Sequence, residues 1–149
     1  MNPFLYALIL SILPVSELRG GIPLAIGTGV NPIVAFLFAT AANIMMIPII
    51  FFFLDYFHVH FMKVRPYERL FNLYIRRLRK KVETKTLGFL LLFSFVAIPL
   101  PGTGAYTGCI LSWFFQMQRK KSTYTIALGV LAAGIIITLV STGFSRLLL

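Results

Sequence analysis

Between two apolar segments near its N-terminus, the chain reads Pro14-Val15-Ser16-Glu17-Leu18-Arg19-Gly20-Gly21-Ile22-Pro23. A proline removes a backbone donor and suits the first turn of a helix, while glycine relaxes the chain. We therefore expect one helix to end near Pro14 and the next to begin near Pro23. Gly20 and Gly21 would be hinge positions in an irregular loop between two half-helices.

The composition indicates an integral membrane protein. Of the 149 residues, 58% are hydrophobic and 12% are charged, and the apolar residues gather in long runs, which is not typical of a soluble domain. The net charge of +10 comes mostly from Lys and Arg between residues 63 and 85 and at 119–121. Such clusters suit the cytoplasmic side of a membrane, and we expect no nucleic-acid partner.

A similar interruption returns in the second half of the chain, as Ile98-Pro99-Leu100-Pro101-Gly102-Thr103-Gly104. Both interruptions lead into an apolar run, a short polar loop and a long apolar segment. A duplicated unit with a broken hydrophobic segment is typical of secondary transporters, whose binding sites lie at the breaks. The alternative is two unrelated proline kinks in membrane helices.

The lengths of the apolar segments predict two full and two partial crossings of the membrane. Residues 2–13 are too few to span the bilayer, which takes about 20 helical residues. We therefore expect residues 2–28 to form a re-entrant hairpin, followed by a transmembrane helix over 32–54. Residues 87–115 would form a second hairpin, and 123–145 a second transmembrane helix.

The two basic clusters predict on which side of the membrane each segment lies. If residues 87–115 crossed the membrane once, the two basic clusters would lie on opposite sides, against the positive-inside rule. If they turn back, the linker 55–86 and the loop 116–122 are both cytoplasmic, and both termini are outside. The linker favours a basic amphipathic helix on anionic lipid, with a solvated linker as the alternative.

The predicted fold class is thus an all-α integral membrane protein with a single membrane domain over residues 1–149. It holds two inverted repeats, 2–54 and 87–145. Each repeat is a re-entrant helical hairpin plus one transmembrane helix, and the basic amphipathic linker helix joins them.

Glu17 and Arg19 are the charged residues of the first interruption and its candidate functional groups. Charged residues in apolar membrane sequence are candidates for function, and in an extended crossing these two side chains would share a side. Glu17 is the candidate coupling group for a proton or cation, and Arg19 the candidate anchor for an anionic substrate such as phosphate. The alternative is a structural ion pair that holds the hairpin shut.

The second interruption carries no charge, so its chemistry would come from the backbone and hydroxyl groups. Glycines permit close approach of a ligand, and the amides that open the following half-helix form a positive end. Asn43, in the middle of the first span, is a further candidate, although a lone amide at such a place more often joins neighbouring helices than binds a ligand. The candidate substrate-binding residues are Arg19, Asn43, Gly102, Thr103, Gly104, Tyr106 and Thr107. The candidate hinge and loop residues are Pro14, Gly20, Gly21, Pro23, Pro99 and Pro101.

We expect neither a metal nor another cofactor. His58 and His60 alternate in the sequence, but no carboxylate or cysteine completes a ligand set beside them. Cys109 is the single cysteine, which excludes an internal disulfide. No serine and histidine arrangement points to a catalytic site, so we expect no enzymatic activity.

Two stretches, Glu17-Leu18-Arg19-Gly20-Gly21-Ile22-Pro23 and Pro99-Leu100-Pro101-Gly102-Thr103-Gly104-Ala105-Tyr106-Thr107-Gly108, resemble the signatures of the small multi-drug export protein family. Its members are small prokaryotic membrane proteins, and the likeness covers essentially the whole chain. Tyr106 stands where the family usually has tryptophan. The family is in turn distantly similar to the DedA/VTT superfamily, which implies re-entrant hairpins, an embedded acid matched by Glu17, and proton-dependent or lipid-phosphate transport.

The sequence therefore predicts a multi-pass protein of a prokaryotic cell membrane that acts as an ion-coupled secondary transporter or lipid flippase. Its partners would be membrane lipids and a small-molecule, ion or lipid-phosphate substrate. Two spans and two hairpins are few to enclose a pathway, so we expect a homodimer. The alternatives are a non-transporting scaffold or lipid-binding protein and, least favoured, an intramembrane enzyme.

Overall fold

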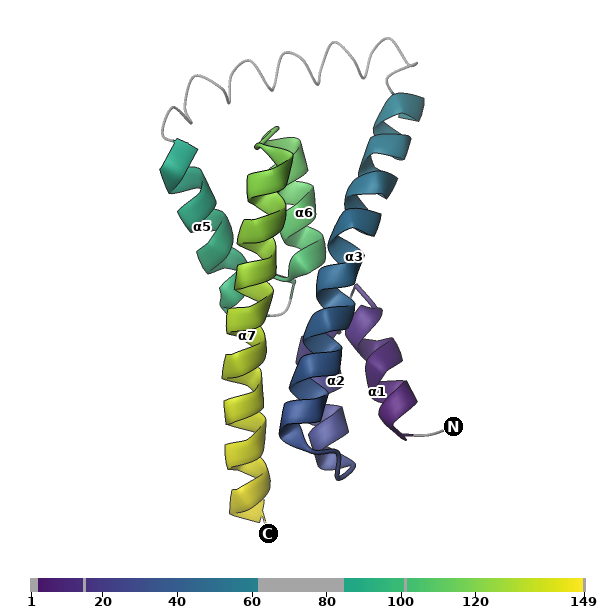
Figure 1. Cartoon of the computed structure of the whole chain (residues 1–149), viewed down its shortest axis with the longest axis vertical. Coiled ribbons are helices and arrows are strands. Elements are labelled where there is room, and N and C mark those ends of the chain that lie inside the picture. Colours follow the sequence, from purple (N-terminus) through teal and green to yellow (C-terminus); the bar gives the residue numbers. More distant parts are fainter. Residues whose placement is uncertain (1–2, 15, 62–84, 101, 149) are drawn as a thin grey trace.

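The structure, a computed structural model, describes residues 3–14, 16–61, 85–100 and 102–148 (Figure 1). All regular structure in these ranges is helical, which agrees with the predicted all-α class. The helices are α1 (Pro3–Ile12), α2 (Glu17–Gly27), α3 (Pro32–Phe61), α5 (Lys85–Ala97), α6 (Ala105–Phe114) and α7 (Arg119–Leu148).

Two long helices, α3 and α7, run in opposite directions and contact each other (Figure 1). Two pairs of short helices pack beside them. The pair α1 and α2 lies toward the end of the molecule where α7 finishes, and the pair α5 and α6 lies toward the end where α3 finishes. The turn within each pair points toward the middle of the molecule, so the two turns meet there.

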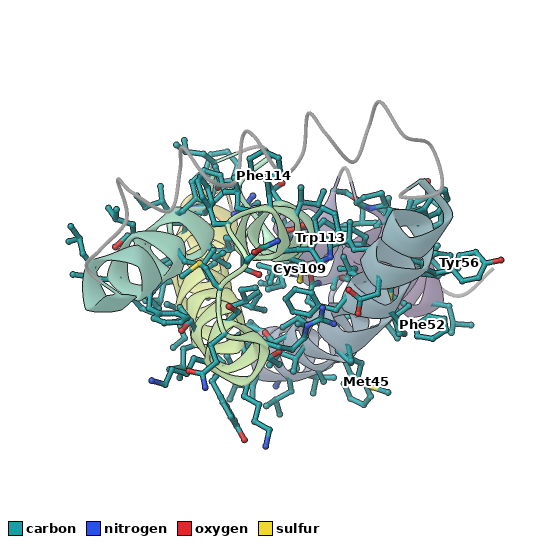
Figure 2. The ribbon with its side chains drawn as sticks, turned by 90° about the horizontal axis from the view of Figure 1, so that it is seen from above. Met45, Phe52, Tyr56, Cys109, Trp113 and Phe114 are labelled. Carbon is teal, nitrogen blue, oxygen red and sulfur yellow. The ribbon has the colours of Figure 1, made fainter. Side chains whose placement is uncertain are left out.

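Only α3 and α7 contain stretches long and apolar enough to cross a membrane among the described residues, at Pro32–Phe57 and Arg119–Phe144. Large side chains on α3 point away from the other helices (Figure 2). Met45, Phe52 and Tyr56 are 70%, 69% and 64% exposed. Exposed apolar surface of this extent would be unfavourable in water and is suited to contact with lipid.

The centre of the molecule is closely packed by side chains from several helices. Ile22 of α2, Ile47 of α3, Val96 of α5, and Ile126 and Val130 of α7 are all fully buried. These residues come from both short pairs and both long helices. The packing therefore fixes the two interruptions relative to each other.

The first interruption differs from its prediction. The helix α1 ends at Ile12, as expected, but α2 begins at Glu17 and contains Gly20, Gly21 and Pro23. The expected restart near Pro23 is therefore wrong. Close packing explains one of the glycines, because a Cβ atom at Gly21 would lie 1.8 Å from Ser11 Oγ on α1.

The long helices extend beyond the predicted spans. The helix α3 continues to Phe61, past the expected end at residue 54, and α7 begins at Arg119 rather than Thr123. Asp55 does not end α3, and its carboxylate accepts hydrogen bonds from Arg119 and Trp113. Most of the expected linker helix, residues 62–84, lies outside the described residues, as does Pro101.

Candidate functional site

Glu17 is the first residue of α2 and reaches into the second interruption. Glu17 is only 5% exposed, and its backbone has a positive φ of 47°. Its Oε1 atom accepts a hydrogen bond of 3.3 Å from the amide of Tyr106, and the amide of Ala105 also faces this carboxylate. These amides open α6, where the helix dipole and the free N–H groups favour a negative charge.

Gly104 makes this contact possible. It immediately precedes α6, and a Cβ atom built on it would lie 1.4 Å from Oε2 of Glu17. No side chain could be accommodated there without moving the carboxylate. The glycine is therefore needed for close approach, as the sequence suggested, but the group that approaches in this structure is Glu17.

Arg19 reaches the other end of the same interruption. Its Nη1 atom donates to the carbonyl of Leu100. Its Nη2 atom lies 3.5 Å from the carbonyl oxygen of Val96, 3.1 Å from that of Ile98 and 2.7 Å from that of Thr103, and 3.0 Å from Thr103 Oγ1. We call these five oxygens the oxygen cage. They lie at and just after the C-terminal end of α5, where the helix dipole favours a cation. The carbonyls of Ile98 and Leu100 also accept hydrogen bonds from the Thr103 hydroxyl.

Glu17 and Arg19 therefore do not form the ion pair that was one of the alternatives. Within the described residues, the ion pair that forms joins Asp55 and Arg119. Instead, each charge of the first interruption satisfies one broken helix end of the second, the acid at the start of α6 and the base after α5. The extended crossing expected for these residues is replaced by a helical turn.

The second interruption contacts the first in return. The hydroxyl of Tyr106 donates to the carbonyl of Ile12, the last residue of α1. The hydroxyl of Thr107 donates to the carbonyl of Gly102 over 2.7 Å, which fixes the turn before α6. Thus Arg19, Gly104 and Tyr106 come together with Glu17, and Thr103 joins them through the oxygen cage.

The sequence was compared with known protein families, curated proteins and solved structures. Residues 17–136 match the family described as "Putative small multi-drug export protein". The chain belongs to this small multi-drug export protein family. Neither the curated proteins nor the solved structures gave a match.

Membership in this export family, together with the two long apolar helices, identifies a membrane protein of a transport class. The matched range begins at Glu17 and contains both interruptions. The more distant similarity to the DedA/VTT superfamily has no support from these comparisons and stays a prediction.

Asn43 of this small multi-drug export family member makes its hydrogen bonds to α1 and α3. It is fully buried, and its Nδ2 atom donates to the carbonyls of Ser11, at 2.7 Å, and Ala39, at 3.1 Å. The bond to Ser11 joins α3 to α1, whereas Ala39 lies on α3 itself, one turn before Asn43. Its Oδ1 atom has no hydrogen-bond partner among the described residues.

A second polar cluster of this family member, formed by Asp55, Arg119 and Trp113, was not predicted from the sequence. The guanidinium of Arg119 holds both oxygens of Asp55, at 2.7 and 2.8 Å, and Nε1 of Trp113 donates to the same carboxylate over 3.2 Å. The guanidinium also lies 4.7 Å from the centre of the Phe51 ring. Figure 2 shows Trp113 pointing inward between α6 and α3. Asp55, the acidic residue that follows the first long apolar segment, is the feature of the sequence that could have indicated this cluster.

Proposed function

We propose that this protein is an ion-coupled secondary transporter whose substrate site lies between the two interruptions. The observation that carries the proposal is the contact of the buried Glu17 carboxylate with the first amides of α6, from the other half of the chain. A buried acid that bridges two halves of a membrane protein can link its protonation to their separation.

In the proposed architecture, α1 with α2 and α5 with α6 are re-entrant hairpins of two inverted repeats, and α3 and α7 cross the bilayer. Irregular backbone is tolerated at membrane depth only where protein or water satisfies it. The bonds from Glu17, Arg19 and Tyr106 supply such partners for both turns. The residues 55–86 and 116–122 are placed in the cytoplasm and both termini outside.

Glu17 acts as the coupling group in this mechanism. As a carboxylate it is attracted to the positive end of α6, so it holds the two turns together. Protonation removes that charge and weakens the attraction, which favours separation of the turns and opening of the site. A sodium ion bound by the carboxylate would have the same effect by neutralising it. Alternating access then follows as one half rocks against the other.

The cargo is proposed to be a small molecule, in keeping with the export function in the family description. A lipid-phosphate cargo makes the protein a flippase that uses the same site. Two spans and two hairpins are few to enclose a pathway, so the working unit is proposed to be a homodimer. No catalysis is proposed.

The test uses the purified protein in liposomes that contain a pH-sensitive dye. A panel of organic cations, organic anions and a labelled phospholipid is added to wild type, Glu17→Gln and the matched control Glu83→Gln. We expect at least one compound to drive proton movement in wild type and Glu83→Gln, and none in Glu17→Gln. Equal thermal melting of the three proteins establishes that the loss is functional.

Two results would count against the proposal. Proton movement that persists in Glu17→Gln removes Glu17 as the coupling group. Absence of any response in wild type, with unchanged phospholipid distribution, removes transport. In that case a scaffold role predicts that neutralising Arg76, Arg77 and Arg79 abolishes the cellular effect, while Glu17→Gln and Arg19→Ala leave it intact.

A further inference from the structure

The oxygen cage holds a cation in an unusual way. The Nη2 atom of Arg19 carries two N–H groups, yet four oxygens from Val96, Ile98 and Thr103 lie within 3.5 Å of it. More acceptors therefore lie around this nitrogen than it has hydrogens, although the Thr103 hydroxyl also bonds to the carbonyls of Ile98 and Leu100. Ordinary capping of a helix end needs one acceptor for each donor, whereas convergence of several oxygens on one point is the arrangement of a cation site.

Arg19 also fits this cage incompletely. Its Nε atom is buried and has no hydrogen-bond partner in the described part of the chain. A guanidinium that bonds well on one edge and leaves another donor unsatisfied loses part of the gain from binding. A free cation of the same chemistry has no side chain to constrain it and can turn to satisfy its donors.

Two residues of the cage lie at the surface of the described structure. Ile98 and Leu100, which supply two of its carbonyls, are about half exposed, at 50% and 56%. The bonds from Arg19 to both carbonyls lie at the exposed edge.

We propose that the oxygen cage is the substrate site, that its substrate is a cation with N–H donors, of the guanidinium or primary ammonium class, and that Arg19 is an internal occupant which the substrate displaces. This inference rests on the proposed transport function and names its substrate class. Carbonyl and hydroxyl oxygens accept hydrogen bonds, so they favour such cations over anions and over quaternary ammonium ions, which have no N–H group.

The proposal changes the role expected for Arg19. As an anchor for an anionic substrate, its N–H groups would face the ligand. Here both Nη atoms face protein oxygens. An anion would have to compete with this bonding, whereas a cation takes the place of the guanidinium in the cage, and the displaced Arg19 must then find other acceptors or water.

The experiment measures binding of radiolabelled methylguanidinium to the full-length protein in lipid nanodiscs, with tetramethylammonium at the same concentration as a competitor that lacks N–H donors. The variants are Thr103→Val, which removes one cage oxygen and its hydrogen bonds to the carbonyls of Ile98 and Leu100, and Thr142→Val as its matched control. The hydroxyl of Thr142 bonds only within α7, to the carbonyl of Thr138.

We expect saturable binding to wild type and Thr142→Val that tetramethylammonium does not displace. Thr103→Val should bind at least tenfold more weakly, and Arg19→Ala, if it folds, at least tenfold more tightly, because the internal competitor is gone. Absence of binding to wild type would overturn the proposal, even if Arg19→Ala binds, since the cage would then be a permanent cap. Equal affinity of Thr103→Val and wild type would also overturn it.

Transport assays separate this inference from the proposed function. If the proton-coupled cargo found in the liposome panel is an anion, the transporter stands and the cage proposal fails. If methylguanidinium binds to the cage but no compound moves protons in wild type, the cage stands and the transport proposal fails.

Discussion

Oε1 of Glu17 and the amide nitrogen of Tyr106 lie 3.3 Å apart, although 89 residues separate them in the chain. This bond places an acid of the first half on the positive helix end of the second half. It is also the contact that a transport cycle of the proposed kind would have to break and remake. Its strength can be tested independently of any substrate.

Replacing Gly104 by alanine should destabilise the protein. The new Cβ would lie 1.4 Å from Oε2 of Glu17, so the carboxylate must leave the α6 amides. We expect a loss of about 1–3 kcal/mol in the free energy of unfolding, as for overpacking of a close contact. Unfolding by denaturant in detergent micelles measures it.

Two controls accompany that prediction. Gly143 of α7 has no atom within 4 Å of its added Cβ, so Gly143→Ala should leave stability unchanged or raise it by about 1 kcal/mol through helix propensity. In a Glu17→Ala background, Gly104→Ala should cost less than in wild type, because the clash is gone. An equal cost in both backgrounds would show that the glycine serves another purpose.

Replacing Tyr106 by phenylalanine tests the hydrogen bond that the second interruption donates to the first. The variant leaves the carbonyl of Ile12, at the end of α1, without the hydroxyl donor. A lost hydrogen bond of this kind costs about 0.5–1.5 kcal/mol. Tyr124→Phe is the matched control, since Tyr124 is 72% exposed. Equal stability of the two variants would contradict the assigned role of the Tyr106 hydroxyl.

The cluster at Asp55 should show energetic coupling with Arg119. The pair is bidentate but about half exposed, at 49% and 47% of the two side chains. We expect a double-mutant cycle with Asp55→Asn and Arg119→Gln to give a coupling of about 0.2–1 kcal/mol, smaller at high salt. Lys121→Gln in place of Arg119→Gln serves as the control and should give no coupling.

Cysteine labelling tests the proposed topology. In a Cys109→Ser background, cysteines at positions 63 and 120 should react with an impermeant reagent from the cytoplasmic side only, and a cysteine at position 146 from the outside only. The expectation follows from the positive-inside rule applied to the two basic clusters. Reaction of positions 63 and 120 from opposite sides would exclude a hairpin at residues 87–115.

Much of the fold followed from segment lengths and breaker residues. The turn after α2, with helix restarting at Pro32, and the end of α5 before Pro99 lie where the sequence placed them. Such features are local, because proline and glycine act on their own backbone. The break at Pro14 was also local, but its length was overestimated, since Gly21 was interpreted as a loop residue and in fact packs against Ser11.

The partners of the charged groups could not be predicted in the same way. Glu17 and Arg19 are close in sequence, which made a pair between them one of the alternatives, but their bonds go to residues 77 to 89 positions away. Spacing along the chain says nothing about such distant partners. Similarly, Arg119 was counted as one of many positive charges, and its bidentate bond to Asp55 depends on how α3 and α7 pack.

Glu17 and Arg19 of the first half bind helix ends of the second half, and this arrangement also constrains how the protein is made. While the first half alone has entered the membrane, the carboxylate of Glu17 and the guanidinium of Arg19 have no α5–α6 turn to bind, since that turn is synthesised later. An unpaired charge in hydrocarbon is costly. In the proposed architecture, stable insertion of the α1–α2 pair therefore waits for the C-terminal half, so the two halves expressed as separate chains should accumulate only when they are produced together.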